Sequence, residues 1–190
     1  MPEVKHTDAL IVVDVQNDFC SGGKMAVPDA ELIIRPINSM LMTFDHLVFS
    51  RDWHPADHCS FSDAPEYKDK SWPAHCVENS PGAEFRADLR VPVDAIVVNK
   101  GTEPDKEAYS AFDSTGLAEK LRDRGITRVF VAGLTLDYCV KATVLDALKE
   151  GFDVVLVEDG TRAVAEGQTD AVLNELRAAG VDIVRSDEVT

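Results

Sequence analysis

Short apolar segments rich in valine and isoleucine recur along the chain, and segments with a helical spacing of apolar residues lie between them. Several of the short segments are apolar at nearly every position, which is typical of strands covered on both faces of a sheet. The pattern therefore predicts six buried strands. They are Ala9–Val13, Leu47–Ser50, Ala95–Val98, Val129–Ala132, Val154–Val157 and Ile183–Val184.

The intervening segments predict helices that carry one apolar face, several of which end at a glycine. They are predicted at Leu117–Arg124, at Val140–Lys149, at Thr169–Ala179 and around the apolar face formed by Ile37, Met40, Leu41 and Phe44. Alternation of strands and helices is typical of α/β proteins. We therefore expect a single doubly wound, mostly parallel six-stranded sheet with helices on both faces, in one domain over residues 1–190.

One region, at about residues 51–93, interrupts this alternation and has neither helical nor strand periodicity. It contains three of the five histidines, both tryptophans and five of the nine prolines. A segment of this length without regular structure is usually a functional loop. We expect it to contribute residues to a ligand or metal site.

The charge balance limits the classes of partner. The 190 residues include 19 basic and 34 acidic residues, which gives a formal net charge of −15. Such a surface repels phosphate backbones and anionic lipids, so we expect no nucleic-acid and no membrane partner. No apolar run is long enough to cross a bilayer, and the first residues lack the pattern of a secretion signal. We expect a cytoplasmic protein that acts on a small molecule and forms a homo-oligomer.

The four cysteines are Cys20, Cys59, Cys76 and Cys139. They form no C-x-x-C pair and are too sparse for a disulfide framework, so free thiols in a reducing compartment are expected. Each is then either a small buried residue or a reactive thiol. Nothing in the sequence marks Cys20 as reactive, and it is interpreted as a buried residue.

Charged and nucleophilic residues follow four of the predicted strands. The first strand leads to Asp14, the second to Asp52 and His54, the third to Lys100, and the fourth to a turn that reaches Cys139. A capping aspartate or a solvated lysine would explain Asp14 or Lys100 taken singly. In parallel α/β sheets, however, ligands bind beyond the carboxyl ends of the strands, where these side chains converge. The cluster as a whole therefore indicates a functional site.

Cys139 is placed in the first turn of a predicted helix. The positive end of the helix dipole and a nearby lysine both lower the pKa of a thiol at such a position. Asp14 can take the thiol proton and later protonate a leaving group. The backbone amides of the Gly133–Cys139 turn can form an oxyanion hole. The pattern predicts a cysteine nucleophile assisted by a carboxylate and an amine.

A metal site is indicated by Asp52 and His54, a D-x-H pair at the end of a strand. A carboxylate and two histidines form metal sites that keep positions open for water or substrate. His75, in SWPAHC, is the first choice for the third ligand, and His58 is its competitor. A D-x-H pair alone can also be a simple hydrogen-bonded pair. We expect one divalent ion per chain, Zn²⁺ first, with Mn²⁺ and Fe²⁺ as alternatives.

Five motifs follow one another in the order known from one protein family. They are VVDVQNDF, SRDWHPADHCSF, SWPAHC, NKGTEPDKEAYSAF and GLTLDYCVKAT. Together they resemble the nicotinamidases of the isochorismatase-like cysteine hydrolase family, from about Ala9 to the final strand. The resemblance implies a metal-dependent amidohydrolase that converts nicotinamide to nicotinate and ammonia through a cysteine thioester, in NAD salvage.

The resemblance also implies roles for individual residues of the reaction centre. The family's catalytic triad falls on Asp14, Lys100 and Cys139. A cis peptide is implied at the Leu134–Thr135 bond, with the amides of Thr135 and Cys139 as oxyanion donors. Thr135 stands where many relatives have a small residue.

The same resemblance implies the metal ligands and the substrate pocket. The ligands it implies are Asp52, His54 and His75, and the pocket residues it implies are Phe19, Trp72 and Tyr109. Phe19 and Trp72 match aromatic walls around a pyridine ring, and Tyr109 matches an aromatic residue near the pocket mouth. His58 is then a structural or water-linked residue outside the ligand set.

Three other functions were weighed against this one. A related amidase that acts on an acyclic or carbamoyl amide without metal would have no use for the metal ligands or Trp72. A thiol sensor with Cys139 as a redox switch would not need a proton-shuttling Asp14. A flavodoxin-like binding module would need a phosphate-cradling loop after the first strand, which QNDFCSGGK does not supply. Nicotinamide hydrolysis is therefore the preferred interpretation.

Overall fold

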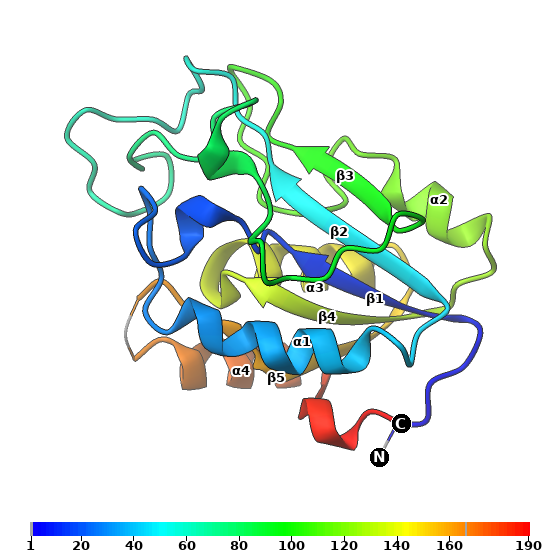
Figure 1. Ribbon diagram of the computed structural model, residues 1–190. Helices are drawn as coiled ribbons and strands as arrows, with labels where there is room; N and C mark the ends of the chain where they lie inside the picture. The colour runs from blue at the N-terminus through cyan, green and yellow to red at the C-terminus, as the bar shows by residue number, and fades with distance from the viewer. Residues whose placement is uncertain (1, 166) are drawn as a thin grey trace.

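Six parallel strands form one sheet at the centre of the protein (Figure 1). The computed structural model describes residues 2–165 and 167–190. The strand order is β3-β2-β1-β4-β5-β6, with all five neighbouring pairs parallel. The strands are β1 (Asp8–Val13), β2 (His46–Asp52), β3 (Ile96–Lys100), β4 (Arg128–Leu134), β5 (Asp153–Arg162) and β6 (Asp182–Val184). The predicted doubly wound α/β fold is confirmed, and the sheet is entirely parallel.

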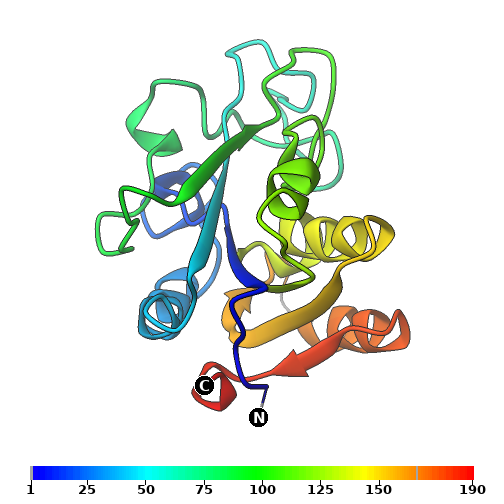
Figure 2. The same cartoon turned by 90° about the vertical axis from the view of Figure 1, so that its right-hand side faces the viewer.

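Helices cover both faces of this sheet (Figure 2). They are α1 (Ile34–Met40), α2 (Leu117–Arg122), α3 (Lys141–Lys149) and α4 (Thr169–Ala178). Helix α1 lies on one face, and the other three lie on the opposite face. Over the described ranges, 2–165 and 167–190, no helix is long and apolar enough to cross a membrane.

Strand β1 shows why the sheet needs cover on both sides. Leu10 and Val12 belong to the core beneath α1, whereas Ile11 and Val13 belong to the core beneath α2, α3 and α4. Alternate side chains of a strand point to opposite faces, so a strand that is apolar throughout feeds two cores. Each fully buried Leu, Ile or Val contributes roughly 1.5–3 kcal/mol relative to an exposed one.

The strand order places the carboxyl ends of β3, β2, β1 and β4 side by side, at the upper left of Figure 1. The irregular segment between β2 and β3 loops over this end of the sheet, as its cyan-to-green trace shows. Short backbone bridges anchor it: Gln16 pairs with Phe85, and His54 pairs with Val77. The long loop is thereby held over the strand ends that carry the predicted site.

Candidate active site

The thiol of Cys139 lies in a single π-helical turn between β4 and α3. This turn comprises Leu136–Val140, and the N–H of Val140 donates to the Thr135 carbonyl at 3.0 Å. The Cys139 side chain is 5% exposed and lines a cavity at the carboxyl ends of the strands. The Leu134–Thr135 peptide bond is cis, as the sequence resemblance implied.

Lys100 joins the predicted triad into one cluster. Lys100 is only 1% exposed, and its ammonium nitrogen lies 2.7 Å from Asp14 Oδ2 and 3.4 Å from Cys139 Sγ. The same Nζ lies 2.5 Å from Asp52 Oδ1. Asp14, Asp52 and Cys139, which are more than 35 positions apart in the sequence, therefore meet at the buried ammonium group of Lys100. The structure brings Asp14, Lys100 and Cys139 together as predicted.

The carboxylate of Asp14 is held from two sides. Ser50 Oγ donates a hydrogen bond to Asp14 Oδ1 at 2.7 Å, and Lys100 binds the other oxygen. In residues 2–165 and 167–190, no further donor reaches that Oδ2. One carboxylate oxygen of Asp14, one of Asp52 and the Cys139 sulfur lie within 4.8 Å of one another. Asp14 is therefore placed to accept a proton from the thiol.

Burial dominates the protonation of this cluster. Burial raises the pKa of the Cys139 thiol well above its usual value, although Lys100 acts in the opposite direction. The expected lowered pKa is thus wrong in its net direction, because removing a thiolate from water costs more than one ammonium neighbour returns. Burial likewise raises the pKa of Asp14 against the opposing effect of Lys100. A carboxylate with a raised pKa is a stronger base for a thiol that must lose its proton during the reaction.

We expect Lys100→Ala to slow the alkylation of Cys139 by iodoacetamide at neutral pH. Lys100 lowers the thiol pKa, so its loss raises that pKa further and depletes the thiolate. A rise of one in the thiol pKa reduces the thiolate population about tenfold. A thiolate of higher pKa is intrinsically more nucleophilic, so the alkylation rate falls by about threefold for each such rise. Lys106→Ala, which removes an exposed lysine paired with Asp113, is the control and should leave the rate unchanged. Equal rates in both variants would show that Lys100 does not tune the thiol.

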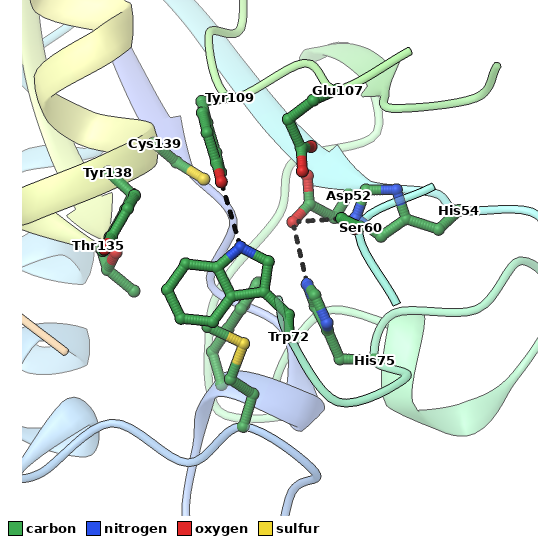
Figure 3. Close-up of a pocket in the computed structure, with 12 residues that line it drawn as sticks. Asp52, His54, Ser60, Trp72, His75, Glu107, Tyr109, Thr135, Tyr138 and Cys139 are labelled. Carbon is green, nitrogen blue, oxygen red and sulfur yellow. Dashed lines mark hydrogen bonds and ion pairs between the residues drawn. The ribbon is translucent and has the colours of Figure 1, made fainter. Parts of the chain in front are cut away.

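Asp52, His54 and His75 form a second cluster beside the triad. One ligand atom from each lies within 4.8 Å of the others, and all three side chains are buried. The Nε2 atoms of His54 and His75 lie 3.4 and 3.8 Å from Asp52 Oδ2, and Figure 3 shows both rings turned toward that carboxylate. Burial alone would raise the pKa of Asp52, but Lys100, followed by His54 and His75, holds it well below its usual range. Asp52 is therefore an anion. One of its carboxylate oxygens contacts Lys100, and the other faces the two histidines.

The geometry of the two histidines fits a metal ion. His54 Nδ1 donates to the carbonyl of Gly101 at 2.8 Å, and His75 Nδ1 donates to the carbonyl of Pro73 at 2.7 Å. With its Nδ1–H bonded to a backbone carbonyl, each ring turns Nε2 toward Asp52, the arrangement found in metal-binding histidines. Gly101, at a φ of 63°, allows this contact, since a Cβ there would lie 2.4 Å from the His54 ring. The donor set of two imidazoles and one carboxylate suits a divalent cation.

His58 has a different environment. Its Nδ1 is 2.7 Å from Ser60 Oγ, its Nε2 is 3.1 Å from the carbonyl of Lys106, and its ring lies 4.2 Å from that of His54. Both nitrogens are thus engaged by protein groups. This agrees with the prediction that His58 is a structural neighbour of the ligand set.

Aromatic side chains form the wall of the cavity between the two clusters. Phe19 lies 5.5 Å from the His75 ring, and Trp72 and Tyr109 both pack against Tyr138. Trp72 Nε1 donates to the Tyr109 hydroxyl at 3.0 Å, and that hydroxyl donates to Asp69 at 2.8 Å. The predicted pocket residues Phe19, Trp72 and Tyr109 all line this cavity. Figure 3 shows Trp72 and Tyr109 in its wall.

The cavity is nearly closed in this conformation. Its volume is about 20 Å³. A cavity that accommodates benzene has a volume on the order of 150 Å³, so an aromatic ligand enters only if part of the wall shifts. Tyr109 and Glu107 also line a wide surface groove of about 660 Å³, which makes them the partition between the cavity and solvent.

Several residues of the site are not predicted from the sequence. They are Gln16, Met25, Ser50, Ser60, Glu107 and Tyr138. Tyr138 precedes the nucleophile, and Glu107 stands in the motif that contains Tyr109, so motif position could have found both. Ser50 and Gln16 look like ordinary strand and turn residues. Their contacts with Asp14 and Asp52 depend on strand pairing, which a local pattern does not reveal.

A profile described as "Isochorismatase domain" matches residues 8–188 of the chain. The chain belongs to the isochorismatase family. Among curated members, a nicotinamidase/pyrazinamidase from Mycobacterium tuberculosis is 40% identical over 188 residues, covering 94% of this chain and 98% of its own.

Solved structures of this family share the fold closely. A pyrazinamidase of Pyrococcus horikoshii in complex with zinc has 43% identity and a TM-score of 0.86, covering 94% of this chain and 99% of its own. PnC1 from L. infantum in complex with nicotinate has 40% identity and a TM-score of 0.89, covering 97% and 96%. The isochorismatase-family architecture therefore extends over nearly the whole chain.

Proposed function

We propose that this protein is a nicotinamidase that hydrolyses nicotinamide to nicotinate and ammonia in NAD salvage. The observation that carries the proposal is the position of one aromatic-walled cavity between a Cys139 nucleophile and an Asp52–His54–His75 ligand set. An amidase for acyclic substrates has no use for that second cluster. The similarity to a nicotinate-bound relative and to nicotinamidases supports the same substrate.

Cys139, Asp14 and Lys100 carry out the first half of the reaction. The Cys139 sulfur attacks the amide carbon while Asp14 accepts the thiol proton. Lys100 contacts both the Asp14 carboxylate and the sulfur, so it stabilises the negative charge on either group. Because burial raises the pKa of Asp14 as well as that of the thiol, Asp14 is a strong enough base to take the thiol proton.

The amides of Thr135 and Cys139 are proposed to hold the tetrahedral oxyanion, since both residues line the cavity beside the sulfur. Asp14 then returns its proton to the departing ammonia, and the acyl group remains on Cys139 as a thioester. A water attacks this thioester as Asp14 takes one of its protons. Cleavage of the C–S bond releases nicotinate and restores the thiol.

Asp52, His54 and His75 are proposed to hold one divalent ion. A divalent ion held there would supply an open position for the nitrogen of the pyridine ring and so would help to orient the amide group. The zinc complex of the Pyrococcus relative supports Zn²⁺, and the same donors also accept Mn²⁺ or Fe²⁺. Phe19, Trp72 and Tyr109 are proposed to pack against the ring.

The proposal is tested by measuring ammonia release from nicotinamide and from benzamide with the metal-loaded protein. Benzamide keeps the amide but lacks the ring nitrogen. A site that ligates one substrate atom rejects the analogue without it by up to about 10⁴-fold, because its own group is left without a partner. We expect rapid hydrolysis of nicotinamide, its loss after chelator treatment, and only trace hydrolysis of benzamide. Equal rates for the two amides would contradict the proposed role of the metal, and no release from nicotinamide would contradict the function.

A further inference from the structure

The side chain of Gln16 is fully buried at the end of β1 and spans to the end of β2. Its Oε1 accepts the backbone N–H of Asp52 at 2.8 Å, and its Nε2 donates to the Asp52 carbonyl at 2.8 Å. Nε2 also donates to the carbonyl of Ala83 at 2.9 Å. A single amide thus clamps both backbone groups of Asp52 and ties them to the irregular segment.

The contact between Gln16 and Asp52 matters because the Asp52 carboxylate must be oriented toward two different groups. One carboxylate oxygen binds Lys100 and the other faces the two histidines, so a small rotation of the side chain weakens both contacts. Asp52 is the last residue of β2, and its neighbour Trp53 already leaves the strand. The sheet therefore holds Asp52 only on the side that faces β3, where Asp52 pairs with Lys100. On the β1 side, Gln16 supplies the hydrogen bonds that a continued strand would have made.

We infer that Gln16 is a positioning residue for the metal centre: its amide fixes the backbone of Asp52 so that the carboxylate meets Lys100 and the two histidines at once. The inference rests on the proposed function only in taking Asp52 as a metal ligand. Gln16 does not line the cavity and touches no reacting atom. Its effect on the metal centre is therefore indirect, through the backbone of Asp52 and through the hydrogen bond to Ala83 in the irregular segment.

Asn17, the next residue, offers a matched control. Its Nδ2 donates to the carbonyl of Pro81 at 2.8 Å, so it ties the same turn to the same part of the irregular segment. Asn17 is partly buried, and no side-chain hydrogen bond within residues 2–165 and 167–190 joins it to Asp52. Asn17→Ala therefore removes a hydrogen bond that ties the turn to the irregular segment. Only a substitution of Gln16 also removes the hydrogen bonds to the backbone of Asp52.

The test compares Gln16→Met and Asn17→Ala with the wild-type protein. Zn²⁺ affinity is measured by competition with a chromophoric chelator, KM and kcat are measured at saturating Zn²⁺, and thermal unfolding is followed in parallel. Removing a partner that orients a metal ligand typically costs 10–100-fold in affinity. We expect Gln16→Met to bind Zn²⁺ about 10–100-fold more weakly and to raise KM more than it lowers kcat. Asn17→Ala should retain the wild-type Zn²⁺ affinity.

The inference is overturned if Gln16→Met is less stable but binds Zn²⁺ as tightly as Asn17→Ala, which would make Gln16 a merely structural residue. Should Gln16→Met fail to fold, the isosteric Gln16→Glu decides the matter. It keeps an acceptor for the Asp52 N–H but loses the Nε2 donor, and we expect at least about tenfold weaker Zn²⁺ binding. Unchanged affinity in that variant overturns the inference. Failure of the ligand assignment is distinguishable, because Asp52→Ala would then bind Zn²⁺ like the wild type, and failure of the proposed function would appear as no ammonia release from nicotinamide by the wild-type protein.

Discussion

Cys139→Ala is expected to lose nicotinamide hydrolysis by at least about 10⁴-fold. Without the sulfur no thioester forms, and the remaining oxyanion donors and binding groups cannot replace a nucleophile. The fold should persist, because the variant removes one small atom from a site formed by other residues. Ammonia release under metal-saturated conditions measures the loss, and calorimetric titration with nicotinamide tests whether binding survives.

The other cysteines provide the controls for this result. Cys59 is exposed and lines the surface groove, and Cys20 is buried with a pKa raised to about 11, so neither thiol lies in the cavity beside Asp14 and Lys100. Burial also raises the pKa of Cys76 well above its usual value, and Cys76 is not among the residues that line the cavity. We expect the alanine variants of these three to keep activity within a few-fold. A Cys139→Ala variant with more than trace turnover would rule out the covalent route.

His54→Ala and His75→Ala are expected to lose bound metal and apparent nicotinamide affinity together. Each variant removes one of three protein ligands, and the proposed metal holds the ring nitrogen of the substrate. Metal content after dialysis should fall well below one ion per chain, and KM should rise by about 100-fold or more. Cys139 alkylation should continue, since Lys100 and Asp14 remain in place.

His58→Ala is the matched control for the metal. His58 packs on the His54 ring, yet both of its nitrogens are engaged by Ser60 and Lys106. The variant should therefore retain about one ion per chain and a nearly normal KM. If His58→Ala strips the metal, or if His75→Ala keeps it, the assignment of ligands is wrong.

Local pattern was sufficient for the elements of the fold. Every predicted strand and helix is present within a few residues, because buried parallel strands are apolar throughout and the helices keep a regular apolar face. β5 is the clearest exception, since it continues to Arg162 through Glu158 and Asp159. Asp159 accepts hydrogen bonds from the amide and hydroxyl of Ser186, which satisfies a polar residue that the local pattern reads as the end of a strand.

The candidate site shows the same division. Asp14, Lys100 and Cys139 could be predicted because parallel strands deliver their carboxyl ends to one edge. Gln16 could not, because its partner Asp52 lies 36 residues away and only the neighbouring positions of β1 and β2 bring them together.

The amino-acid pattern alone predicts the alternation of strands and helices, the residues that follow each strand and the motifs that resemble one hydrolase family. The protonation of these residues and the size of the cavity depend on the folded chain. Folding buries Cys139 and Asp14 so deeply that their pKa values rise despite Lys100, and it leaves the aromatic-walled cavity with a volume of about 20 Å³. The physical reason is that periodicity is a local property, whereas desolvation and charge pairing depend on groups that only folding brings within a few ångströms.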